Sequence, residues 1–194
     1  MSASLQEIVT YCDQRVRREQ IADFPGAENG LQCENDGKIH AIGAAVDAGL
    51  VPFREAVANG IQLLIVHHGM LWQPPTPAVD VHYEKFRTLI EGNLAVYSSH
   101  LPLDAHPEIG NNAILAQKMG LEIENYFLEH EGTPIAALAK HNDHRDALRN
   151  KLHTLFGNAF HAIEYGDESP DKIGILTGSG ASAIPHLKEA GTDT

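Results

Sequence analysis

The chain has 194 residues, 43% of them hydrophobic and 21% charged, and a formal net charge of −12. This composition is typical of a globular protein with room for one large domain or two small ones. The negative charge and the lack of a basic run argue against nucleic acid or an anionic membrane as partner. We interpret Cys12 and Cys33 as reduced thiols of a cytoplasmic protein, with a disulfide as the alternative. The sequence contains no signal-peptide core and no run of 18 apolar residues.

Hydrophobic periodicity predicts alternating helices and strands. Apolar residues recur at helical spacing after Ser4, and Glu7 completes a capping box with it. Two strands joined by a helix then follow within 30 residues, which indicates a βαβ unit with a right-handed crossover. The elements expected are strands over 39–46, 61–66, 94–99 and 172–177, and helices over 4–16, 52–58, 83–91, 111–119, 143–155 and 184–191.

The most informative stretch is the apolar run 63–66, which stops at His67, His68 and Gly69. Such a run fits a strand buried on both faces of a parallel sheet, and the carboxyl end of such a strand is where ligands bind. We expect the strand to end before the histidines, with a turn after Val66 that brings both rings toward one pocket. Two neutral imidazoles suit a site for two metal ions, one ring to each.

The next predicted strand also delivers polar residues at its carboxyl end, namely His100 and, after it, Asp104. Both clusters should open on the same edge of the sheet. His67, His68 and Asp104 form a candidate metal set, because imidazole and carboxylate together suit Zn, Fe, Mn, Co or Ni. Three side chains are too few for two ions, which need a bridging group as well. The alternative is that the histidines cap a strand and Asp104 caps a helix or turn.

Two further residues are candidates for the substrate or for the outer shell of the site. His100 could contact substrate, and Asp47 either caps the helix that follows it or accepts a hydrogen bond from a ligand. We expect His106 to lie on the surface. The sequence has no Gly-x-Ser-x-Gly elbow and no evident Cys-His pair, so no catalytic side chain is assigned.

The second half is harder to interpret. No regular element is assigned between residues 123 and 142, and the five histidines in this half before residue 162 are expected to be solvated or hydrogen-bonded. The turn 178–182 resembles a phosphate cradle, with a plain strand-to-helix turn as the alternative. The chain stops where the next strand of a second βαβ unit should begin, so we expect a shortened chain. The predicted fold is α/β, with two βαβ-type halves of mixed or parallel sheets flanked by helices, over 1–123 and 124–194.

Four motifs occur in an order that resembles the Nif-three-like family, whose members are often named GTP cyclohydrolase 1 type 2. They are Glu28–Gln32, Ala44–Asp47, Ile65–Trp72 and Tyr97–Asp104.

The resemblance implies an α/β fold, a centre with two divalent metal ions per subunit and a toroidal homohexamer. His67 and His68 would each bind one of the two ions, and Asp104 would bind one of them. The family's other ligands are a histidine and a bridging glutamate in a C-terminal motif, before which this chain ends. His186 and Glu189 lie too early to be those ligands.

The function expected from the resemblance is metal-dependent hydrolysis of a nucleotide or a similar phosphorylated small molecule. The name cyclohydrolase implies opening of the guanine imidazole ring by activated water, which fits the predicted donors. A non-catalytic metal-binding scaffold that regulates partner proteins is the alternative. A structural paralogue without metal is a third possibility.

Overall fold

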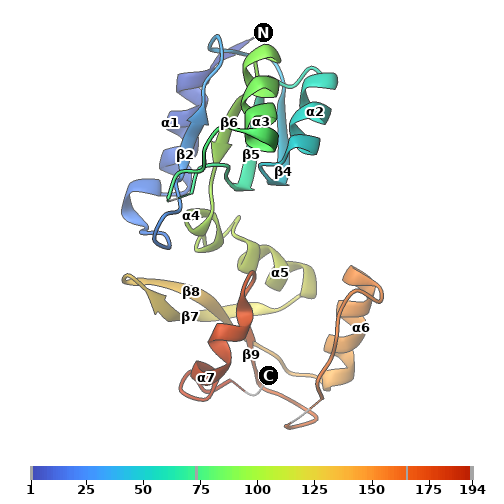
Figure 1. Ribbon diagram of the computed structural model, residues 1–194. Coiled ribbons are helices and arrows are strands. Elements are labelled where there is room, and N and C mark those ends of the chain that lie inside the picture. Colours follow the sequence, from blue (N-terminus) through green and yellow to red (C-terminus); the bar gives the residue numbers. More distant parts are fainter. Residues whose placement is uncertain (1, 73, 165, 193–194) are drawn as a thin grey trace. The chain divides into compact units, whose positions relative to one another are not determined.

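The computed structural model describes residues 2–72, 74–164 and 166–192. The chain divides into two compact units, residues 1–103 and 104–194, and each has its own sheet and core (Figure 1). The predicted α/β fold is confirmed. The predicted halves meet at 123/124, whereas the two compact units meet at 103/104, before the helix at 111–119, which packs in the core of the second unit.

The first unit is built on a four-stranded sheet in the order β2-β6-β5-β4. Strands β4, β5 and β6 are parallel, and β2 joins the edge antiparallel. A separate two-stranded ribbon pairs β1 with β3. The strands are β1 (Ala3–Ser4), β2 (Gly30–Cys33), β3 (Lys38–Ile39), β4 (Ile42–Asp47), β5 (Leu63–His68) and β6 (Ala95–Ser98).

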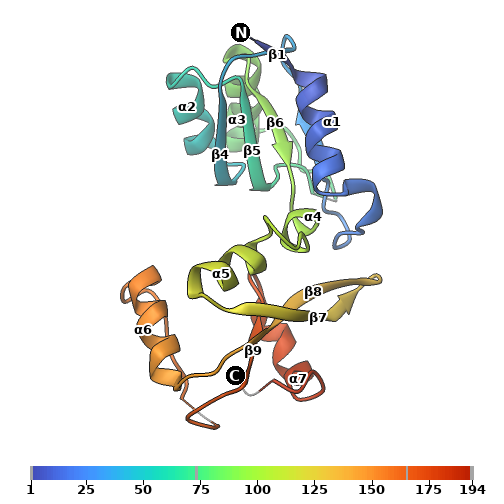
Figure 2. The same cartoon turned by 180° about the vertical axis from the view of Figure 1, so that it is seen from behind.

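Helices cover both faces of this sheet, as the two views show (Figures 1 and 2). Helices α2 (Leu50–Ala58) and α3 (Asp80–Glu91) bury Phe53 and Leu89 against one face. Helix α1 (Leu5–Arg15) packs Leu5 and Val9 against the other. The short helices η1 (Arg18–Gln20) and α4 (Leu101–Asp104) complete the unit's secondary structure, α4 running into the first residue of the second unit. Burial on both faces explains the uninterrupted apolar run of β5.

Local signals in the sequence locate several helix ends correctly. The Ser4 hydroxyl accepts the backbone N–H of Glu7 at 3.1 Å, and the Glu7 carboxylate accepts that of Ser4 at 3.2 Å, so the predicted capping box is confirmed.

The predicted end of β5 is wrong. The strand continues through both histidines, and His68 pairs with Asp47 of β4, because the parallel ladder still supplies hydrogen-bond partners at those positions.

The second unit contains an antiparallel sheet in the order β7-β8-β9, which differs from the predicted βαβ pairing. A tight turn joins β7 to β8, and such a turn can only connect antiparallel strands. This hairpin was not predicted, because much of β7 is polar and neither strand alternates cleanly. The elements are α5 (Asn111–Met119), β7 (Glu122–His130), β8 (Thr133–Lys140), α6 (Arg145–Phe156), β9 (Lys172–Ile175), η2 (Gly180–Ala183) and α7 (Ile184–Leu187).

Helix α5 matches its predicted bounds, and it ends at Gly120 in the left-handed conformation (φ 64°) that favours glycine. Across residues 2–72, 74–164 and 166–192, no helix combines the length and the apolar character that crossing a bilayer requires.

A buried polar link joins α1 to the middle of the first sheet. The Tyr97 hydroxyl of β6, only 1% exposed as a residue, donates to Asp13 Oδ1 at 2.9 Å, and Arg18 Nε donates to the same oxygen at 2.7 Å. Burial and the hydrogen bond to Asp13 raise the pKa of Tyr97 well above its ordinary value. Native Tyr97 therefore keeps its proton at a pH where the unfolded chain loses it.

This link makes stability sensitive to alkaline pH. Because the folded-state pKa is raised, the contribution of Tyr97 is complete below about pH 10 and is lost as pH rises above that value. We expect Tyr97→Phe to lower the free energy of unfolding by about 1 kcal/mol at pH 7. It should also flatten the decline above pH 10, as measured by urea denaturation between pH 7 and 11. The control is Tyr11→Phe, since Tyr11 is 65% exposed. Parallel curves for wild type and Tyr97→Phe above pH 10 would contradict this account.

Candidate metal centre

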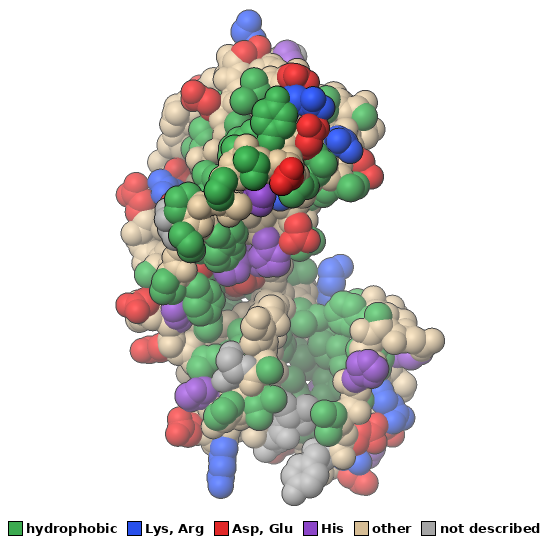
Figure 3. Space-filling view, in the orientation of Figure 1, with side chains coloured by type: hydrophobic (Ala, Val, Ile, Leu, Met, Phe, Trp, Pro, Cys, Tyr) green, Lys and Arg blue, Asp and Glu red, His purple; other side chains and the backbone are tan. Residues whose placement is uncertain are grey.

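Three histidines meet at the carboxyl end of the first sheet. His67 and His68 are the last residues of β5, and His100 follows β6, the parallel neighbour of β5. The ring centroids lie 4.7 Å apart for His67 and His68, 4.9 Å for His67 and His100, and 5.5 Å for His68 and His100. One nitrogen from each ring can be chosen so that all three lie within 4.8 Å of one another, a spacing that could hold a metal ion. Figure 3 shows histidine side chains gathered where these strands end. We call these three residues the histidine triad.

Each ring of the triad is anchored through Nδ1. His67 Nδ1 lies 3.0 Å from the Ser99 carbonyl oxygen, and His68 Nδ1 lies 2.7 Å from Asp47 Oδ1. His100 Nδ1 lies 2.8 Å from Asp23 Oδ1. A carbonyl and an ionised carboxylate only accept hydrogen bonds, so Nδ1 is the donor in each case. The neutral rings therefore carry their lone pair on Nε2, which is the form of histidine that binds metals.

Asp23 is the central acceptor beneath His100. Its carboxylate side chain is only 5% exposed and accepts from Asn29 Nδ2 at 2.7 Å, from the backbone N–H of Leu101 at 2.9 Å and from that of Phe24 at 2.7 Å, in addition to His100. Burial alone would raise the pKa of Asp23, but these hydrogen bonds outweigh it and lower the pKa to about 2. The carboxylate therefore stays ionised at neutral pH and fixes the orientation of the His100 ring.

The loop after β5 is held by Gln32 of β2. The Gln32 carbonyl oxygen accepts the backbone N–H of Met70 at 2.7 Å, and its amide donates to the Glu28 carbonyl at 2.7 Å. A Cβ at Gly69 would overlap the Gln32 amide and the Ser98 hydroxyl. A side chain at position 69 would therefore displace the Gln32 amide that holds this loop.

The structure locates the other predicted site residues. Asp47 is the last residue of β4, 71% exposed in its side chain, and it contacts His68 as an outer acceptor; it does not cap α2, whose N-cap is Gly49 without a side-chain bond. Asp104 ends α4 and opens the second unit, where its carboxylate accepts Asn111 Nδ2 at 2.6 Å. Its role as a ligand stays a prediction.

The predicted surface position of His106 is wrong. It is only 4% exposed, and its Nδ1 accepts the backbone N–H groups of Glu108 and Ile109 at 3.1 and 3.3 Å. These bonds close the turn before α5, so His106 supports that local structure.

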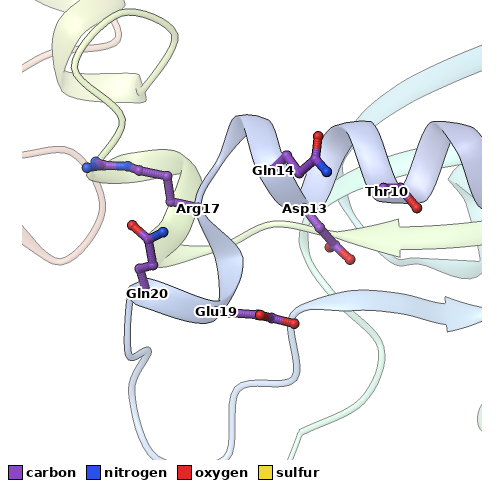
Figure 4. Close-up of a pocket in the computed structure, with 6 residues that line it drawn as sticks. All are labelled: Thr10, Asp13, Gln14, Arg17, Glu19 and Gln20. Carbon is purple, nitrogen blue, oxygen red and sulfur yellow. The ribbon is translucent and has the colours of Figure 1, made fainter.

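A separate cavity of about 460 Å³ lies at the end of α1 (Figure 4). Its polar walls come from α1, η1 and Arg17 between them. Among them is Asp13, whose carboxylate accepts the hydrogen bonds from Arg18 and Tyr97. Because Arg18 and Tyr97 already compensate this carboxylate, we assign the cavity to the polar contact between α1 and β6 and not to a ligand site. The lining residues are Thr10, Asp13, Gln14, Arg17, Glu19 and Gln20.

Residues 3–194 match the family described as Duf34/NIF3 (NGG1p interacting factor 3). The chain belongs to the Duf34/NIF3 family. It is 37% identical to a GTP cyclohydrolase 1 type 2 homolog from Deinococcus radiodurans, over 97% of this chain and 72% of that protein. A protein of the same name from Archaeoglobus fulgidus is 31% identical, over 98% of this chain and 76% of its own length.

The fold of this Duf34/NIF3 protein also resembles solved structures. The crystal structure of TTHA1606 from Thermus thermophilus superposes with a TM-score of 0.82 and 32% sequence identity, over 95% of this chain and 74% of that one. The Nif-three-like resemblance inferred from the four motifs is therefore confirmed.

Three residues that organise the site in this Duf34/NIF3 chain were not among the predicted site residues. Asp23 and Asn29 lie in the loop before β2, far from the histidines in sequence, and no spacing rule connects them to His100. Asn29 and Gln32 both lie in a motif of the resemblance, but the contact of Gln32 with the loop after β5 depends on β2 joining the edge of the sheet. Only the strand order could have revealed these contacts.

The two carboxylates beside the triad should differ in their effect on stability. Asp23→Ala leaves four hydrogen-bond donors without their acceptor, so we expect a loss of about 2–3 kcal/mol in the free energy of unfolding. Asp47→Ala breaks one exposed contact and should cost less than about 1 kcal/mol. Urea denaturation at pH 7 measures both. Equal losses would contradict the central role of Asp23. Because its pKa is lowered, its contribution is present above about pH 4 and is lost as pH falls through about 2.

Proposed function

We propose that this protein binds divalent metal at the histidine triad and uses it to hydrolyse a nucleotide or a similar phosphorylated small molecule. The observation that carries this proposal is the proximity of three imidazoles: each has its Nδ1 on an oxygen acceptor, and one nitrogen of each ring lies within 4.8 Å of a nitrogen of the other two. Such pairing of ligand histidines with outer acceptors is typical of protein metal sites.

The donor set fits a first-row transition metal. Imidazole suits Zn, Fe, Co and Ni, and no thiol lies in the triad to favour a structural sulfur site. Two of the three outer acceptors are carboxylates, Asp23 and Asp47, which increase the basicity of His100 and His68. Three nitrogens leave coordination positions for water and substrate, as catalytic sites do.

The residues of the chain supply the geometry of the proposed reaction. Asp23 and Ser99 hold the rings of His100 and His67 near one another before an ion binds. When bound, the ion supplies Lewis-acid activation of water and of a polar group on the substrate. The choice of a nucleotide rests on the name of the relatives, GTP cyclohydrolase 1 type 2 homolog. No side chain of this chain is assigned as acid or base.

Several finer points are carried by the family resemblance and are part of the proposal. They are a second metal ion, Asp104 as a ligand of one ion, further ligands from a C-terminal histidine and glutamate, a toroidal homohexamer and a cytoplasmic location. Size-exclusion chromatography with light scattering tests the hexamer directly.

Metal content should depend on the triad. After loading with Zn²⁺, Mn²⁺ or Fe²⁺ and dialysis, we expect His67→Ala and His100→Ala to lower metal affinity by at least about tenfold, as measured by elemental analysis and competition with a chelator. Asp104→Ala should lower it as well if that residue is a ligand. Far-ultraviolet circular dichroism should stay unchanged, because these side chains lie at strand and helix ends.

The matched control is His40→Ala, since His40 is exposed and lies outside the triad. Unchanged metal affinity in both triad variants would overturn the metal site. Turnover is then tested by incubating metal-loaded protein with GTP and other nucleotides and following the products by chromatography. Full metal occupancy without turnover would favour the non-catalytic scaffold.

A further inference from the structure

A second cavity in the first unit adjoins the histidine triad. Its volume is about 480 Å³, within the range of roughly 300–1,000 Å³ that is usual for small-molecule sites. Its walls are largely apolar and include an indole and a phenyl ring, a composition that suits a flat, poorly hydrated ligand group. We call this cavity the Trp72 pocket; its apolar lining residues are Leu31, Met70, Leu71, Trp72, Pro75 and Phe86.

Two contacts hold Trp72 at the wall of this pocket. Its Nε1 donates to the Gly69 carbonyl at 3.0 Å, and its backbone forms a β-bridge with Ala27. The residue nevertheless remains 38% exposed. A fixed aromatic ring with its N–H already bonded offers a ligand its π-face, and it loses little entropy on binding.

The pocket and the triad share the same supports. The Trp72 ring meets the His100 ring edge-on, with centroids 5.4 Å apart and an interplanar angle of 77°. Asn29 lines the pocket, and its Oδ1 accepts the backbone N–H of His100 at 2.7 Å. A ligand in the pocket would therefore lie beside the triad, with Trp72 between the two.

The polar groups of the pocket indicate how it recognises a ligand. The Gln32 amide is committed at both ends, to Met70 and to Glu28, and both ends of the Asn29 amide are committed to His100 and Asp23. These amides are thus occupied by the chain itself. The other polar residues of the lining are Glu28, Thr76 and His82, and the apolar walls offer stacking and apolar contact to a flat heteroaromatic ring.

We propose that the Trp72 pocket binds the nucleobase of the substrate, with the Trp72 indole as a stacking wall that places the base beside the triad. Trp72 is accordingly a specificity-determining residue for heteroaromatic substrates. This inference rests on the proposed function for the reaction it serves, but binding of the base itself requires no metal.

The first experiment uses the intrinsic fluorescence of the chain, because Trp72 is its one tryptophan. Protein stripped of metal with EDTA is titrated with guanosine, and in parallel with ribose 5-phosphate, which lacks a base. We expect saturable quenching by guanosine and none by ribose 5-phosphate. Equal responses to both compounds, or no saturable response to guanosine, would overturn the proposal. An emission change that depends on protein concentration, with no effect of guanosine, would mean that a second copy covers the pocket, and would also overturn it.

The second experiment measures guanosine binding by equilibrium dialysis. Trp72→Leu should weaken binding about tenfold or more, whereas Trp72→Phe, which keeps an aromatic face, should stay within about threefold of wild type. The matched control is Phe24→Leu. Phe24 also flanks His100, with centroids 6.2 Å apart, but it is not among the pocket's lining residues. Equal losses in Phe24→Leu and Trp72→Leu would show that only the His100 surroundings matter, and would contradict a stacking role.

Metal content is measured on the same protein preparations before EDTA treatment. This measurement separates the metal-centre proposal from the Trp72-pocket proposal. Guanosine binding by a protein that takes up no metal would retain the Trp72 pocket and reject the metal centre. Metal uptake through the triad without saturable quenching would do the reverse.

Discussion

The site depends on one physical constraint, which is that each imidazole of the triad must present Nε2 while its Nδ1 is bound to an oxygen of the chain. Ser99, Asp47 and Asp23 provide those oxygens from three different segments. A histidine on a strand end would otherwise sample several rotamers and both tautomers. The hydrogen bonds remove that freedom before any ligand binds, so the entropy of fixing the rings is lost on folding and not on binding.

The parallel pairing of β4, β5 and β6 makes this arrangement possible. Parallel neighbours finish at the same edge, so residues 21 positions apart (β4 and β5) or 32 positions apart (β5 and β6) lie side by side there. Helices on both faces bury the apolar run of β5, and its polar side chains, His67 and His68, lie at the carboxyl end of that strand. The antiparallel strand β2 then adds Gln32 beside β6, which positions the loop that carries Trp72.

Two carboxylates of this unit, the buried Asp23 and the partly buried Asp13, are compensated in different ways. Asp23 collects four donors and becomes a stronger acid, while Asp13 is shared by the Arg18 guanidinium and the Tyr97 hydroxyl. Both remove the penalty of an unpaired buried charge. Asp23 supports the triad at the carboxyl end of the sheet. Asp13 joins α1 to Tyr97 in the middle of the sheet.

The sequence by itself determined the α/β class, the helix signals at Ser4 and Gly120, the strand ends that carry His67, His68 and His100, and the family. These are local features, since capping, apolar runs and short motifs act within a few residues. Only the tertiary structure decided that β5 extends through its histidines, that β7 and β8 form a hairpin, that His106 is buried, and that Asp23, Asn29 and Gln32 support the site. Each of these depends on which strands pair and which loops meet, and hydrogen bonds between segments far apart in the chain leave no periodic trace in the residues that make them.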